Sequence, residues 1–152
     1  MNRRTFLFGA LGAGALTAIG AVPFALVDED AVLLAAIDAI FPPLEGMPTG
    51  AEVDAAAAFR RYIANLPTRT RFEARGLLRA IEVGAAATTG SRFTVLDRDG
   101  RTVFLEGLLD GVFPQRLLAN GLKQVCAVAY WQHPRTWTAL AYDGPLVGRS
   151  AP

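Results

Sequence analysis

Few side chains in this sequence can do chemistry, and those few stand apart from one another. Cys126 is the only cysteine and His133 the only histidine. A single cysteine excludes an internal disulfide, a CxxCH haem attachment and a multi-cysteine zinc or iron–sulfur cluster. A hydrolase would need a nucleophile next to a base, but His133 precedes a proline and no G-x-S-x-G sequence surrounds any serine. We interpret Cys126 as a structural thiol and His133 as a loop residue that bonds to backbone.

The carboxylates indicate no site either. Asp97, Asp99 and Gly100 have the first spacing of a calcium loop, but the remaining ligands are out of register, so a turn and a helix start are expected. Asp38 and Glu82 are the carboxylates that an enzyme could use in a cleft between helices, although neither belongs to a motif. We expect no catalytic residue, no bound cofactor and no metal ligand in the chain itself.

An aromatic segment near the C-terminus has the most unusual composition in the chain. Residues 130–137 read YWQHPRTW, and Trp, Tyr and Arg are the side chains that anchor protein interfaces. The two tryptophans could also close a small helical core, and the two interpretations are compatible. The partner-binding residues that we predict are Tyr130, Trp131, Pro134, Trp137, Tyr142 and Pro145.

The N-terminus resembles a twin-arginine export signal. Arg3 and Arg4 stand directly before Thr5, Phe6 and Leu7, and the 23 residues from 5 to 27 carry no charge. In that signal family the arginine pair, with the apolar pair after it, is recognised by the translocase, and the apolar run enters the bilayer. A helix needs about 20 residues to cross the hydrocarbon core, so the segment could also stay as an anchor, and cleavage remains open.

The rest of the sequence predicts one all-α domain. We divide the chain into a signal or anchor at 1–27 and a helical accessory domain at 28–152, because no long alternation typical of strands occurs. Asp28 and Asp30 are good helix caps, and Pro42 with Pro43 stops the first helix. Five helices are expected, near residues 31–41, 51–66, 69–87, 102–109 and 114–131.

The apolar spacing also predicts which helix faces point inward. The inward residues expected in the second and third helices are Val53, Ala57, Tyr62, Leu66, Phe72, Leu77, Leu78 and Ile81. Arg71, Arg75 and Arg79 form a row on another face of the third helix, which is typical of a solvated surface. Arginines alternate with carboxylates along the domain, so nucleic-acid binding is not expected.

Taken in order, these landmarks resemble the gluconate 2-dehydrogenase subunit 3 family, the small gamma subunits of membrane-associated flavin dehydrogenases. The likeness is carried by the twin arginines, by residues 37–42 (IDAIFP), by residues 48–51 (PTGA) and by the tail from Tyr130 to Pro145. Ala141 stands where the family usually has glycine, and the loop after Phe41 lacks acidic residues often seen there. These two departures leave the substrate class and the partner open.

The resemblance implies a non-catalytic subunit. Such a subunit binds a flavoprotein catalytic subunit that acts on sugars or alcohols and escorts it through the twin-arginine pathway to the periplasm or the periplasmic face of the inner membrane. FAD, and haem c or iron–sulfur centres, would then belong to partner subunits, among them a cytochrome c. The alternative is a stand-alone helical binding module tethered to the membrane in the cell envelope.

Overall fold

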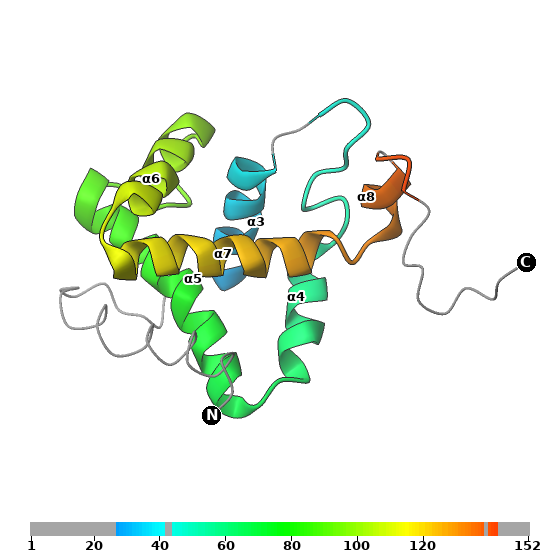
Figure 1. Ribbon diagram of the computed structural model, residues 1–152, viewed down its shortest axis with the longest axis horizontal. Helices are drawn as coiled ribbons and strands as arrows, with labels where there is room; N and C mark the ends of the chain where they lie inside the picture. Colours follow the sequence, from blue (N-terminus) through cyan, green and yellow to red (C-terminus); the bar gives the residue numbers. More distant parts are fainter. Residues whose placement is uncertain (1–26, 42–43, 139, 143–152) are drawn as a thin grey trace, which may run out of the picture.

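The computed structural model describes residues 27–41, 44–138 and 140–142, which form an all-helical domain (Figure 1). Arg3, Arg4, Phe6, Leu7 and Pro145 lie outside the described residues, so the predicted signal and the end of the tail are not placed. Within the described part, no helix is both long and apolar enough to cross a membrane. Its six helices are α3 (Glu29–Ile40), α4 (Ala55–Ala64), α5 (Thr68–Thr89), α6 (Arg98–Asp110), α7 (Phe113–Tyr130) and α8 (Pro134–Thr138).

Helix α3 lies at the centre of the domain and contacts α4, α5, α6 and α7. Asp28 caps its N-terminus, because the Asp28 carboxylate accepts the backbone N–H groups of Asp30 and Ala31 at 3.1 Å. The helix ends at Phe41, whose N–H still bonds to the Ile37 carbonyl, just before the two prolines. The position of α3 explains why the side chains of Val32 and Leu33 are fully buried.

Helices α4 and α5 form a hairpin whose turn projects away from α7 (Figure 1). Asp54, directly before α4, has the left-handed φ of 49°. This turn places the first helical residue at Ala55, four residues later than expected. At the far end of α5, Gly90 stops the helix with a φ of 76°, a conformation that glycine adopts without a side-chain clash.

Helices α6 and α7 complete the core. Asp97 caps α6 by accepting the Gly100 N–H at 2.8 Å, which confirms the predicted helix start and lengthens this helix beyond 102–109. Pro114 opens α7, and the Gln115 side chain accepts the Val112 N–H at 2.8 Å. Helix α7 crosses the front of the domain and contacts α3, α4, α5 and α6 (Figure 1).

Ion pairs join the ends of α3 to its neighbours. Glu29 binds Arg79 at 2.7 Å and Arg75 at 3.5 Å, both on α5. Asp30 binds Arg60 of α4, and Asp38 binds Arg101 of α6 at 3.4 Å. The first turn of α3 is therefore attached to both helices of the α4–α5 hairpin.

Three predictions about side chains in the hairpin are wrong. Tyr62 and Phe72 do not point inward but are 42% and 68% exposed, because both lie close to the projecting turn. The arginine row is not merely a solvated face, since Arg75 and Arg79 bind Glu29 and Arg71 donates to the carbonyls of Ala64 and Leu66 at 3.3 and 3.2 Å.

Candidate docking surface

Three segments that lie far apart in the sequence meet at one end of the domain. Phe41, at the end of α3, stacks on Tyr130 with ring centroids 5.1 Å apart and meets Trp131 edge-on at 5.5 Å. The Tyr130 hydroxyl donates a 2.6 Å hydrogen bond to the Pro48 carbonyl. The segments 37–41, 48–51 and 130–131, each a landmark of the family resemblance, therefore form one packed unit.

The loop at 48–51 fits against α3 because of a glycine. A Cβ atom at Gly50 would lie 2.8 Å from the Ile37 Cγ2 atom, closer than side-chain carbons pack. The loop then closes on itself, because the Glu52 carboxylate accepts the N–H and the hydroxyl of Thr49 at 2.7 and 2.9 Å. These bonds from Thr49, with a smaller contribution from the Arg135 charge, lower the pKa of Glu52 below its ordinary value.

Helix α8 is a short turn that the sequence did not predict. Pro134 provides its first residue, and the His133 carbonyl accepts both the N–H and the hydroxyl of Thr136, at 3.0 and 2.7 Å. The Trp137 indole N–H donates to the Trp131 carbonyl at 2.7 Å. The turn could have been predicted from the order of residues 133–136: Pro134 comes directly after a loop residue, His133, and Thr136 follows two positions later.

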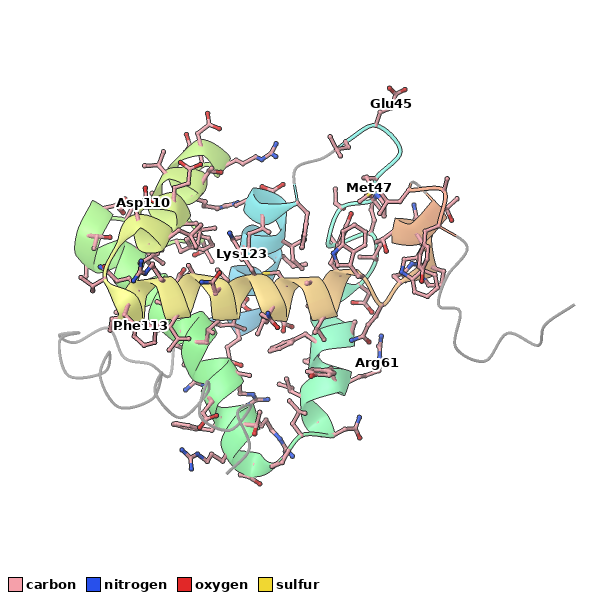
Figure 2. All side chains as sticks on the ribbon, in the orientation of Figure 1. Glu45, Met47, Arg61, Asp110, Phe113 and Lys123 are labelled. Carbon is pink, nitrogen blue, oxygen red and sulfur yellow. The ribbon has the colours of Figure 1, made fainter. Side chains whose placement is uncertain are left out.

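Two shallow hollows open on this end of the domain. The first, of about 360 Å³, is lined by Pro134, Trp137, Thr138, Ala141 and Tyr142. The second, of about 290 Å³, is lined by Leu34, Ile37, Asp38, Phe41 and residues 48–51. We call the surface made by the two hollows, by α8 and by the partly buried Trp131 the α8 face. Figure 2 shows α8 and the neighbouring loop with Met47 at the end of α7 that is farthest from Phe113.

The predicted partner-binding residues divide between this surface and the core. Pro134 and Tyr142 are exposed, and Trp131 and Trp137 are partly buried, so all four are accessible on the α8 face. Tyr130 is only 2% exposed and is a core residue, because its ring stacks on Phe41 and its hydroxyl is bonded. Tyr130 therefore belongs to the core beneath this surface.

Part of this surface was not predicted from the sequence. Phe41 was expected only as an inward residue of the first helix, and Asp38 only as a carboxylate in a cleft. Leu140, which is 56% exposed, lies in the tail expected to contact a partner but was not among the individual residues predicted. The proximity of the 48–51 loop to the aromatic tail depends on a contact between residues 82 positions apart. In the sequence, only the turn-forming residues 48–50 (PTG) indicated that this loop folds back on α3.

Ala141 has a backbone conformation that is unusual for its residue type. Its φ is 51°, in the left-handed region that favours glycine. The Tyr142 N–H nevertheless bonds to the Trp137 carbonyl at 3.0 Å, and the two rings lie 6.1 Å apart. Glycine at this position would adopt the conformation without a side-chain clash.

The other reactive side chains have structural contacts. Cys126 is fully buried, and burial raises the pKa of its thiol. The His133 ring accepts the Arg135 N–H at 3.2 Å, which confirms its loop role. Glu82 binds Arg92 and Thr94, and Asp38 binds Arg101, so each carboxylate belongs to a different ion pair. Within the described residues, no group of three or more His, Cys, Asp or Glu side chains could hold a metal ion.

Comparisons of the chain with protein-family models, with curated proteins and with solved structures found no match. The likeness to the gluconate 2-dehydrogenase subunit 3 family therefore stays a prediction from the sequence landmarks.

Proposed function

We propose that this chain is a non-catalytic small subunit that binds a flavin-dependent sugar or alcohol dehydrogenase and escorts it through the twin-arginine pathway. The chain supplies the export signal, through Arg3, Arg4, Phe6 and Leu7, and a surface that holds the catalytic subunit. The α8 face is the contact surface. FAD and any haem c or iron–sulfur centre belong to the partner subunits.

The observation that carries the proposal is the meeting of the three landmark segments at the α8 face. Residues 37–41, 48–51 and 130–142 are held together by the Phe41, Tyr130 and Trp131 rings and by the bond from Tyr130 to Pro48. If these three segments served only to maintain the fold, they could lie anywhere in the core. Residues of these segments instead line two hollows, and Tyr142, which is 49% exposed, packs its ring against Trp137.

The requirement for an escort follows from the chemistry of flavoproteins. A protein that folds around FAD does so where the cofactor is made, in the cytoplasm, so it crosses the membrane folded. A catalytic subunit without a signal then depends on a bound partner that has one. The twin-arginine resemblance and an aromatic face on one small chain match this division of roles.

The experiment is co-purification of the tagged full chain from its own host. The expected partner is a protein of larger size with flavin absorbance and dye-linked dehydrogenase activity. The Trp137→Ala variant should weaken this association by roughly 2 kcal/mol or more, as expected for an aromatic interface anchor. Its fold is checked by circular dichroism, because the Trp137 N–H also bonds to Trp131.

Phe113→Ala is the matched control. Phe113 is 65% exposed, and it lies at the end of α7 opposite α8 (Figure 2). This variant should retain the flavoprotein. The proposed contact is wrong if a folded Trp137→Ala variant co-purifies as well as the wild type, or if the flavoprotein is lost only in the Phe113→Ala variant.

A further inference from the structure

Charge is distributed unevenly between residues 55–79, which comprise α4 and the first part of α5, and the rest of the domain. Residues 55–79 contain six arginines and one glutamate, a net charge of +5. The other described residues contain six basic and twelve acidic side chains, a net charge of −6. The two opposite charges nearly cancel, so the formal net charge of the whole chain is only +1.

The charges in the hairpin differ in how much they are neutralised. Three of these arginines lie near the core and are paired with carboxylates in the first turn of α3: Arg60 with Asp30, and Arg75 and Arg79 with Glu29. Nearer the turn, the Arg69 side chain is 70% exposed although it pairs with Glu73. The side chain of Arg61 makes no ion pair within the described residues. The excess positive charge is therefore at the projecting end.

Exposed aromatic rings lie at the same end. Phe72 is 68% exposed and Tyr62 is 42% exposed. We call the part of the hairpin with Arg61, Tyr62, Arg69 and Phe72 the hairpin tip. Figure 1 shows that the hairpin turn extends away from α7 and from α8, and Figure 2 shows Arg61 on the outer side of α4.

We infer that the hairpin tip binds an anionic membrane surface. Arginine guanidinium groups bind lipid phosphates, and aromatic rings enter the region between headgroups and acyl chains. The tip projects from the rest of the domain (Figure 1). A projecting, basic and aromatic tip fits a deformable lipid surface better than the rigid pocket that an acidic protein would have to present.

The two surfaces can be used at the same time, because the tip and the α8 face lie on different parts of the domain (Figure 1). Lipid contact at the tip would leave the α8 face open to the catalytic subunit. The inference rests on the charges and exposed rings of the tip, and it does not depend on the identity of the catalytic subunit.

A fluorescent label at the tip tests the inference in the full chain. Thr68 is exposed at the start of α5, and Cys126 is buried, so a Thr68→Cys variant can be labelled at one site with an NBD dye. Phosphatidylcholine vesicles with and without phosphatidylglycerol are added at an ionic strength of about 0.15 M. The dye emission should rise and shift to shorter wavelength only with phosphatidylglycerol. A dye on a Gln132→Cys variant, near α8, should not respond.

The arginines are tested in the same assay. Arg61→Gln with Arg69→Gln should lower the apparent lipid affinity of the tip by about 30-fold, since each arginine near an anionic surface contributes about a fivefold factor. The matched control, Arg98→Gln with Arg116→Gln, removes the same charge from α6 and α7 and should leave the response unchanged.

Three results would overturn the inference. They are no emission change at residue 68, an equal change with phosphatidylcholine alone, and a change produced only by an added catalytic subunit, which would indicate an acidic protein surface. The first two results come from vesicles and this chain alone, with no catalytic subunit present, so the failure of the inference and the failure of the escort proposal are distinguishable.

Discussion

Ala141 has a backbone conformation that destabilises the segment after α8. An L-residue with a side chain costs about 1–2 kcal/mol in the left-handed region, and glycine avoids that cost. The Tyr142 N–H bond to Trp137 holds Ala141 there. The segment after α8 is therefore less stable than its hydrogen bonds alone would make it.

We predict that Ala141→Gly stabilises this segment. The gain should be up to about 1 kcal/mol, because relief of the left-handed strain exceeds the extra chain entropy that glycine brings. Amide exchange followed by NMR should show about fivefold slower exchange of the Tyr142 N–H. Ala87→Gly, at an exposed position inside α5, is the control and should destabilise its helix. Faster exchange at Tyr142 in Ala141→Gly would contradict the strain argument.

At the scale of elements, Glu82 holds the connection between α5 and α6. Its carboxylate is 1% exposed and accepts bonds from the Arg92 side chain at 2.9 Å, the Thr94 hydroxyl at 2.7 Å and the Thr94 N–H at 3.0 Å. A buried carboxylate with three donors stabilises this loop together with Phe93, which is fully buried in the core. The charge at Glu82 therefore has a structural role.

We predict that Glu82→Gln lowers the free energy of unfolding by about 2 kcal/mol, because an amide oxygen accepts these bonds less strongly and its NH₂ group faces donors. Urea denaturation measures the change. Glu106→Gln, exposed on α6, should change stability by less than about 0.5 kcal/mol. Equal stability of the Glu82→Gln and wild-type proteins would show that the three bonds contribute nothing net.

The helices were more predictable than their ends and faces. Apolar spacing predicted α3, α5 and α7 within a few residues, because their stripes pack against one another in the core. The left-handed turn at Asp54 delayed α4, and the sequence has no glycine there to signal it. Tyr62 and Phe72 follow the inward stripe by spacing, but the hairpin extends beyond the helices that could cover them.

The candidate surface was predicted in the same incomplete way. The aromatic tail was recognised from its composition, and Trp131, Pro134, Trp137 and Tyr142 are accessible on the α8 face. Composition could not tell that Tyr130 points into the core, because that depends on the distant Pro48 carbonyl. Nor could spacing predict that Phe41 and the 48–51 loop complete the surface.

At the scale of the whole molecule, the two proposals use different parts of the domain. We propose that the α8 face contacts a protein and that the hairpin tip, with its arginines and exposed rings, contacts a lipid surface. The predicted signal at 1–27 would bring both to the membrane. Under these proposals the chain is an adaptor whose contribution to the complex is attachment and delivery.

The most direct test of this account is the location of the dehydrogenase when the signal is disabled. Arg3→Lys with Arg4→Lys keeps the charge but removes the guanidinium pair that we propose the translocase recognises. In the host, this variant should leave the flavoprotein and its dye-linked activity in the cytoplasm, while the α8 face still binds it. Normal periplasmic activity in cells that carry only this variant would contradict the escort role.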